Sequence, residues 1–169
     1  MRAFLNTIIW AFVFASNSVI AAELEQVELG AISHSDAALV VLAPDGTETI
    51  YTPAQLEQFT TYRLTTTTPW RENPATFEGV LLSDILEANG LSGVETIAVT
   101  AENDYSTSIS RDVIGSVQIL VATRVDGRAH SRRARGPIQF VIDAAAYQAS
   151  ELATESHLVW MAARIEPAE

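Results

Sequence analysis

Short apolar segments of strand length, separated by residues typical of turns, make up most of this sequence. The clearest of them span residues 38–43, 96–101, 117–125, 138–142 and 158–165. Pro44-Asp45-Gly46 follows the first segment and predicts a turn into a hairpin partner at residues 48–51. Residues 62–70 contain a run of threonines and also favour a strand, because β-branched side chains pack well on a pleated surface.

Only two stretches have clear helical patterns, and both are short. Thr52 can cap a helix that begins with Pro53, and Gln55 completes a capping box. Residues 82–89 have apolar side chains at helical core spacing, and Gly90 can supply a left-handed C-terminal cap. Strands therefore outnumber helices. The sequence predicts an α+β fold with a mixed β-sheet and short helices.

The N-terminus has the parts of a secretory signal peptide. Arg2 precedes an apolar run at residues 3–15, and small residues end at Ala21 and Ala22. We expect cleavage there, which makes residues 1–22 the signal peptide and residues 23–169 a single domain in the periplasm. An uncleaved membrane anchor is the alternative, but the apolar run is short for a bilayer span.

Composition closes off several classes of function. The chain of 169 residues has 10 basic and 21 acidic side chains and a net charge of −11, so we expect no nucleic-acid partner. It contains no cysteine, which excludes disulfides, cysteine nucleophiles, iron–sulfur clusters and any metal held by a protein thiolate. It also contains no lysine, which excludes Schiff-base chemistry.

Five of the ten arginines lie within twelve residues, at positions 124, 128, 132, 133 and 135. The guanidinium fork binds phosphate or carboxylate, or pairs with the acceptors of a heterocycle. For Arg124 and Arg128 we expect pairing with surface carboxylates. Arg133 and Arg135 stand beside the rigid Gly136-Pro137, where an anion or heterocycle site and simple surface pairing are both open.

Polar and aromatic residues at two predicted strand ends are further candidates for a binding site. Asn103, Asp104 and Tyr105 directly follow the segment 96–101, and their donors and acceptors suit an amino-pyrimidinone edge. An ordinary turn is the alternative, because Asn-Asp is common turn chemistry. Trp70 ends the threonine run and could stack on a flat ligand or anchor the core. Trp160 alternates with Leu158 and Ala162 and is expected in the core.

Searches for catalytic motifs are negative. The sequence has no Gly-x-Ser-x-Gly elbow, no phosphate-binding glycine loop and no His-Glu-x-x-His helix. His34, His130 and His157 are far apart in the chain. His34 and Asp36 could contact a metal, but two such residues in a polar segment are usually solvated.

Taken in order, these motifs resemble the oxidoreductase molybdopterin-binding domain family, whose fold is that of sulfite oxidase. The resemblance covers about residues 38–166, and it is closest to the small exported single-domain members. The motifs are TTTPW at 66–70, FEGVLLSDIL at 77–86, AENDY at 101–105, 121–127, RARGP at 133–137 and Val159-Trp160. The resemblance implies a sulfite-oxidase-type molybdopterin-binding domain fold.

This sequence departs from the family at the metal ligand. Catalytic members hold molybdenum through a cysteine that follows the strand corresponding to residues 62–70, and this chain has no cysteine. We therefore expect no molybdenum and no sulfite-oxidase-type reaction. The pterin cleft can survive that loss. Within the family, some small exported proteins without the cysteine bind pterins and report them to a membrane-bound diguanylate cyclase or phosphodiesterase, and the resemblance implies the same role here.

The resemblance implies binding of a pterin that is not covalently attached, rather than catalysis. Arg133 and Arg135 would pair with the polar edge of the pterin, and Asn103, Asp104 and Tyr105 would line the other side. Trp70 would stack on the ring. Two alternatives remain open: a molybdopterin oxidoreductase, or a subunit of one, with a non-cysteine metal environment, and an interaction module that has lost every ligand.

Overall fold

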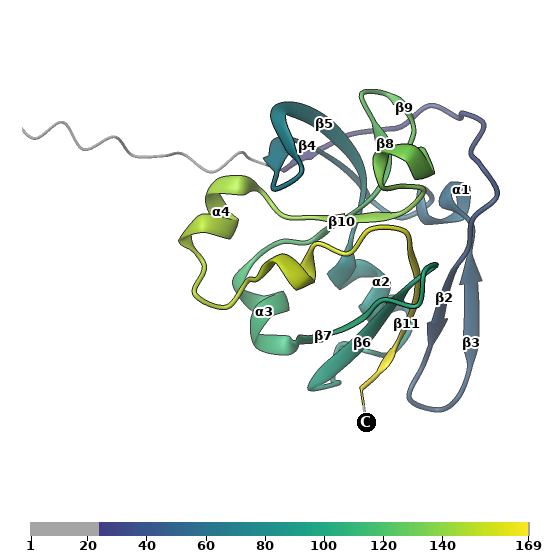
Figure 1. Cartoon of the computed structure of the whole chain (residues 1–169). Helices are drawn as coiled ribbons and strands as arrows, with labels where there is room; N and C mark the ends of the chain where they lie inside the picture. Colours follow the sequence, from purple (N-terminus) through teal and green to yellow (C-terminus); the bar gives the residue numbers. More distant parts are fainter. Residues whose placement is uncertain (1–23, 169) are drawn as a thin grey trace, which may run out of the picture.

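The computed structural model describes residues 24–168, and its strands form two sheets that pack against each other (Figure 1). The first sheet is antiparallel throughout, with strand order β1-β4-β5-β8-β10 and β9 paired to β8. Its strands are β1 (Glu25–Gln26), β4 (Thr61–Thr68), β5 (Arg71–Leu81), β8 (Leu120–Val125), β9 (Arg128–Ala129) and β10 (Gln139–Val141).

The second sheet is mixed, with strand order β3-β2-β11-β6-β7. β11 pairs with β2 in parallel, and the other pairs are antiparallel. Its strands are β2 (Leu39–Leu42), β3 (Glu48–Tyr51), β6 (Thr96–Ala101), β7 (Ser106–Ser110) and β11 (Ala162–Pro167). Strand β2, near the start of the described residues, and β11, the last strand, are thus neighbours in one sheet.

Short helices connect and cover the sheets. They are α1 (Pro53–Leu56), α2 (Leu82–Ala88), α3 (Arg111–Ser116), α4 (Ala144–Ala149) and the 3₁₀ turns η1 (Arg132–Ala134) and η2 (Glu155–His157). The capping box predicted at α1 is confirmed, because Gln55 N–H donates to the Thr52 hydroxyl and the Gln55 side chain accepts from Thr52 N–H. Within residues 24–168, no helix has the length and apolar character needed to cross a bilayer.

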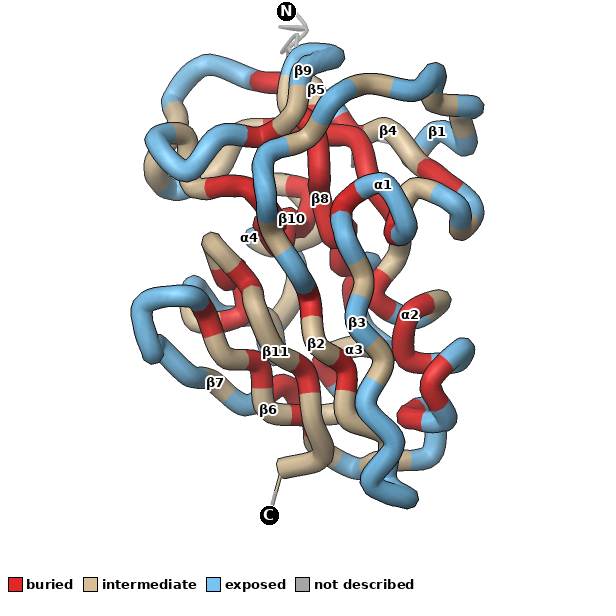
Figure 2. Tube along the Cα trace, turned by 90° about the vertical axis from the view of Figure 1, so that its right-hand side faces the viewer, coloured by how far each residue is buried: buried red, intermediate tan, exposed pale blue. Residues whose placement is uncertain are grey.

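The main core lies between the two sheets. Leu39 and Val41 of β2, Val99 of β6 and Ile165 of β11 face Val121 of β8, and all five are fully buried. A smaller cluster around Leu64 and Phe77 lies on the other side of the first sheet. Figure 2 shows burial along β8 and β10, with β3 exposed at an edge of its sheet.

The α+β class and the mixed sheet are confirmed, but the strands divide between two sheets rather than one. Residues 71–81, which no sequence pattern marked as a strand, form the long strand β5, which pairs with β4 and then with β8. The last strand begins at Ala162 rather than at residue 158, because a 3₁₀ turn and Met161, at φ 54°, interrupt the chain before it. The expected signal peptide at residues 1–22 lies outside the described residues.

Candidate functional site

Two cavities share Trp70 and gather most of the predicted site residues. The first, which we call the arginine cavity, has a volume of about 320 Å³, and the second, the aromatic cavity, about 360 Å³. The arginine cavity is lined by Thr68, Trp70, Arg71, Arg133, Arg135 and Gln139, among others. The aromatic cavity is lined by Trp70, Asn103, Tyr105, Glu155, Ser156 and Trp160, among others.

A cluster of one arginine and two indoles joins the linings of the two cavities: Arg135 lines the arginine cavity, Trp160 lines the aromatic cavity, and Trp70 lines both. The rings of Trp70 and Trp160 lie 6.0 Å apart with an interplanar angle of 38°. The guanidinium carbon of Arg135 lies 4.9 Å from the Trp70 ring and 4.6 Å from the Trp160 ring. Both distances are within the range of a cation–π interaction. The prediction that Trp160 lies in the core is therefore wrong: this residue is partly exposed and lines the aromatic cavity.

The backbone around Arg135 explains how this side chain reaches the indoles. Arg135 follows η1 in the left-handed conformation, at φ 78°, which is uncommon for a residue with a Cβ. Its carbonyl accepts a hydrogen bond from Met161 N–H at 3.1 Å, and Gly136 N–H donates to Ser131 O at 2.8 Å. These bonds hold the loop of residues 131–137 beside the segment that carries Trp160.

Arg132 anchors the same loop to two other parts of the chain. Its guanidinium makes two hydrogen bonds of 2.8 Å to the carboxylate of Glu102 and one of 2.9 Å to the carbonyl of Asp36. The adjacent Arg133 is exposed. Within residues 24–168, neither the Arg133 nor the Arg135 side chain has an ion pair or hydrogen bond. Their donors are therefore free for a ligand.

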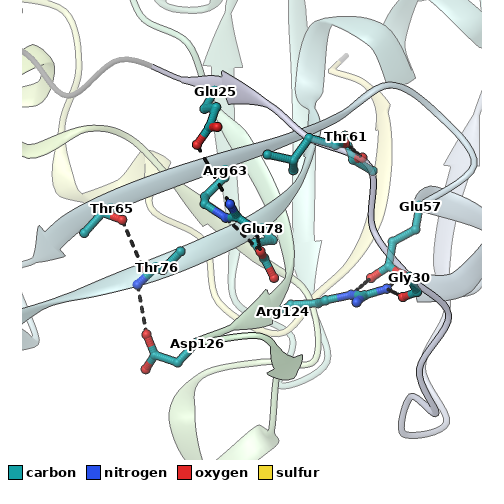
Figure 3. Close-up of polar contacts among 11 residues, drawn as sticks. Glu25, Gly30, Glu57, Thr61, Arg63, Thr65, Thr76, Glu78, Arg124 and Asp126 are labelled. Atoms are coloured by element: carbon teal, nitrogen blue, oxygen red, sulfur yellow. Dashed lines mark hydrogen bonds and ion pairs between the residues drawn. The ribbon is translucent and has the colours of Figure 1, made fainter.

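The other two arginines of the cluster lie away from the cavities. Arg124 pairs with a carboxylate as expected, but the pair is buried rather than at the surface: Arg124 is 4% exposed and binds Glu57 and the carbonyl of Gly30 (Figure 3). Arg128 is exposed on β9, and its side chain has no ion pair among the described residues.

Asn103, Asp104 and Tyr105 form the turn between β6 and β7. Asp104 N–H donates to Ala101 O, and Tyr105 N–H donates to the Asn103 side-chain oxygen. Asn103 and Tyr105 line the aromatic cavity, and Tyr105 is 42% exposed. Asp104 lies in the left-handed region at φ 62° and lines neither cavity, so the turn alternative accounts for this residue.

Gln139 is a lining residue that the sequence did not reveal. It lies in β10, is 2% exposed, and accepts a hydrogen bond of 2.8 Å on Oε1 from His130 Nε2. Burial lowers the pKa of His130, and the nearby charge of Arg71 adds to the effect. His130 is therefore neutral near pH 7. A glutamine inside the apolar segment 138–142 was the available signal, because buried polar side chains need a specific partner.

Arg71 and Glu155 were also missed, since no motif or periodic pattern in the sequence includes either residue. Arg71 begins β5 and lies 3.8 Å from Asp126 at its nearest ion-pair contact. Glu155 begins η2 and lines the aromatic cavity. Local sequence patterns could not place these two residues at the cavities, because their positions there depend on the pairing of distant segments.

His34, which the sequence offered with Asp36 as a possible metal contact, lies against a carboxylate instead. His34 Nε2 lies 3.1 Å from Glu57 Oε1, and both side chains are buried. Within residues 24–168, no group of three or more histidines and carboxylates is arranged to hold a metal ion.

Comparison with known proteins gives the fold but no family assignment. No protein-family model matches the chain, and no curated protein matches it. The structure is similar to that of the sulfane dehydrogenase SoxCD from Paracoccus pantotrophus, with a TM-score of 0.57 and 16% sequence identity. The match covers 81% of this chain and 40% of that chain. The chain thus spans less than half of that protein's length, and it has the α+β, sulfite-oxidase-type fold that the motifs predicted.

Proposed function

We propose that this protein binds a pterin without catalysing a reaction on it. We further propose that it reports the ligand in the periplasm to a membrane-bound cyclic-di-GMP signalling enzyme, a diguanylate cyclase or phosphodiesterase. The observation that carries the proposal is the arrangement at the two cavities. Trp70, Trp160 and Tyr105 line the aromatic cavity, and the guanidinium of Arg135, which has no ion pair or hydrogen bond within residues 24–168, lies over both indoles.

The aromatic cavity suits a flat, polar ring. Indole and phenol faces stack on heterocycles, and each such contact adds about 0.5–1.5 kcal/mol beyond the buried area. Glu155 can accept the amino and ring N–H donors of a pterin, and Asn103 can both donate and accept. Arg133 and Arg135 can donate to the carbonyl oxygen and ring nitrogens from the neighbouring cavity.

The residues present do not fit molybdenum. The chain has no cysteine. Thr67 and Thr68 end β4 and Pro69 follows it, at the place where the family resemblance puts the ligating thiolate. Hydroxyl groups are poor substitutes for a soft thiolate ligand. The pterin part of the cofactor needs only stacking faces and hydrogen-bond partners, which the two cavities offer.

Signalling would operate through the loop of residues 131–137. A ligand held by Arg133 and Arg135 would restrict this loop, and a partner with higher affinity for the restricted form would then bind more tightly. The loop is also tied through Arg132 to the segment around Asp36, so one ligand could order two surface segments together.

The direct test is titration of the purified protein with oxidised and reduced pterins, followed by tryptophan fluorescence and calorimetry. We expect saturable binding that weakens at least tenfold in Arg135→Ala and in Trp160→Leu. Arg128→Ala is the matched control, because it removes one exposed arginine outside both cavities and should bind as the natural protein does. Absence of binding to every pterin would overturn the proposal.

The signalling step needs its own experiment. Capture of the periplasmic domain of a membrane-bound cyclase or phosphodiesterase should increase when pterin is added, and the increase should vanish in Arg135→Ala. Partner capture that is equal with and without pterin would favour a ligand-free interaction module. The fold similarity to a sulfane dehydrogenase keeps an oxidoreductase as the second candidate, and stoichiometric molybdenum in protein from molybdenum-replete cells would favour it.

A further inference from the structure

Strand β3 forms an open edge of the second sheet. Within residues 24–168, β3 pairs with β2 alone, and its other side has no partner strand (Figure 1). Such an edge offers backbone donors and acceptors to another chain, and proteins commonly guard it with lysine, proline or a bulge. β3 contains neither lysine nor proline, and its pairing with β2 runs without a shift in register. This edge is therefore able to accept a further strand.

The hairpin register shows which backbone groups of β3 point outwards. Ala43 N–H donates to Thr47 O at 2.8 Å, and hydrogen-bonded and non-hydrogen-bonded pairs alternate along an antiparallel ladder. In the register of β2 with β3, the backbone of Thr49 is thus bonded to β2. The N–H and C=O groups of Glu48 and Ile50 then face the open side of the strand.

The side chains at this edge include an exposed apolar group. Ile50 is 59% exposed, the largest fraction among the large apolar side chains of residues 24–168. Its cross-strand neighbour Val40 is only partly buried. A hollow of about 360 Å³ lies beside β3, and Tyr51 and Phe59 are among its lining residues. The opposite edge of the sheet, β7, differs, because Ile109 there is fully buried and the exposed side chains are serines.

The charges at the edge favour one register for a second copy of the chain. Glu48 is the charged residue of β3, and its carboxylate accepts a hydrogen bond of 2.8 Å from Arg164. A two-fold register centred on Glu48 would place two carboxylates opposite each other, which is destabilising. A register centred on Thr49 instead places Glu48 opposite Ile50 of the second copy. The two copies of Thr49 then face each other, and threonine pairs of this kind stabilise a sheet.

We infer that β3 is a self-association edge, through which two copies of this chain pair their β3 strands antiparallel about a two-fold axis at Thr49. In that register Glu48 exchanges both backbone hydrogen bonds with Ile50 of the second copy, so every outward group of both residues is used. The two Ile50 side chains lie diagonally on one face, within reach of each other. Because β3 has four residues, the interface is small, and the dimer forms only as protein concentration rises.

This dimer does not depend on the proposed function. The aromatic cavity includes Asn103 and Tyr105 of the turn between β6 and β7, and β7 is the edge of the sheet opposite β3. No residue that lines either the arginine cavity or the aromatic cavity belongs to β3. Self-association at β3 therefore leaves both cavities open, and pterin binding and dimer formation can each fail without the other.

Sedimentation velocity of the purified protein at increasing concentration tests the edge. We expect the sedimentation coefficient of the natural protein to rise and that of Ile50→Lys to stay at the monomer value. Leu152→Lys is the matched control, because it replaces another exposed apolar side chain, 48% exposed and outside β3, and it should associate normally. Both variants lower the net negative charge equally, so general repulsion cannot explain a difference between them. A natural protein that stays monomeric throughout, or association that survives Ile50→Lys, would overturn the inference.

A single cysteine tests the register, because the chain has none of its own. The two copies of Thr49 would form a non-hydrogen-bonded pair, whose Cα separation of about 4.5 Å suits a disulfide. On oxidation, Thr49→Cys should form covalent dimers about tenfold faster than Ser108→Cys in β7, because pairing raises the local thiol concentration. Ser108 is the more exposed of the two residues, so exposure alone would favour the control. Equal rates, or a faster reaction of Ser108→Cys, would overturn the inference.

Discussion

The carboxylate of Glu57 and the guanidinium of Arg124 form a two-point ion pair in the protein interior, with distances of 2.8 Å and 2.5 Å (Figure 3). Thr123 also donates to this carboxylate, and Arg124 donates to Gly30 O at 2.8 Å. Burial opposes ionisation of Glu57, but Arg124, Thr123 and His34 outweigh it and lower its pKa. The pair joins the end of α1, strand β8 and the N-terminal segment.

Replacing Arg124 with methionine should destabilise the fold by about 3 kcal/mol, because it leaves the carboxylate of Glu57 buried without its main partner. Urea unfolding at pH 7 measures the change. The double variant Arg124→Met with Glu57→Met should be more stable than the single one, since two apolar groups of similar size bury no charge. A single variant as stable as the natural protein would contradict the role given to this pair.

The free energy of unfolding should fall as the pH drops below about 6.5, the ordinary pKa of histidine, because of two residues, His130 and His157. Burial lowers the pKa of both His130 and His157, so the unfolded chain binds these protons more readily than the folded one. The loss begins near pH 6.5 and continues down to the folded-state pKa of each group. Unfolding free energies at pH 7.5 and 5.5 measure it.

The contribution of His157 to this acid sensitivity can be measured separately, because its side chain makes one identified hydrogen bond. The neutral Nδ1 accepts a hydrogen bond of 3.0 Å from Thr154 N–H, and a protonated ring could not accept it. His157→Asn offers an acceptor that does not titrate, so this variant should have a smaller difference in stability between the two pH values. An unchanged difference would assign the acid sensitivity elsewhere.

Much of the local structure was predictable, because it depends on neighbouring residues. The helix start at Thr52, Pro53 and Gln55 is an example. Strand β5 was not predictable in the same way, because Pro74 and the polar residues around it resemble a loop. Pro74 has no paired residue in the register of β4 or β8, so its missing N–H breaks no ladder bond. The pairing of distant strands makes this segment a strand.

The candidate site was predictable only where its residues are neighbours in the sequence. Arg133 and Arg135 could be found because unusual residues cluster in sequence beside Gly136. Trp160 was placed wrongly because alternation suggested a regular strand, whereas the chain there is irregular and brings the indole beside Trp70. Gln139 and Glu155 become candidates only once the cavities are known.

Gly79 should not tolerate a side chain. It lies in β5 beside a bulge in the pairing with β8, and a Cβ there would collide with the Val121 carbonyl oxygen and lie 2.8 Å from the Ala122 Cα. Gly79→Ala should therefore destabilise by several kcal/mol or prevent folding. Gly115→Ala in α3 is the control, because nothing lies within 4 Å of its added Cβ, and it should be neutral or stabilise by up to about 1 kcal/mol. Thermal unfolding of both variants makes the comparison.

Arg132 should matter more for ligand binding than for folding. Its pair with Glu102 is largely exposed, so Arg132→Ala should leave the unfolding midpoint nearly unchanged. The same change frees the loop of residues 131–137 from Glu102 and from Asp36 O, and the loop must then be ordered when a ligand binds. We expect pterin affinity to fall severalfold, as measured by calorimetry, although Arg132 lines neither cavity. Arg128→Ala again serves as the control for lost charge. If Arg132→Ala binds pterin as tightly as Arg128→Ala does, the loop does not need this anchor, and the coupling proposed between the ligand and the segment around Asp36 fails with it.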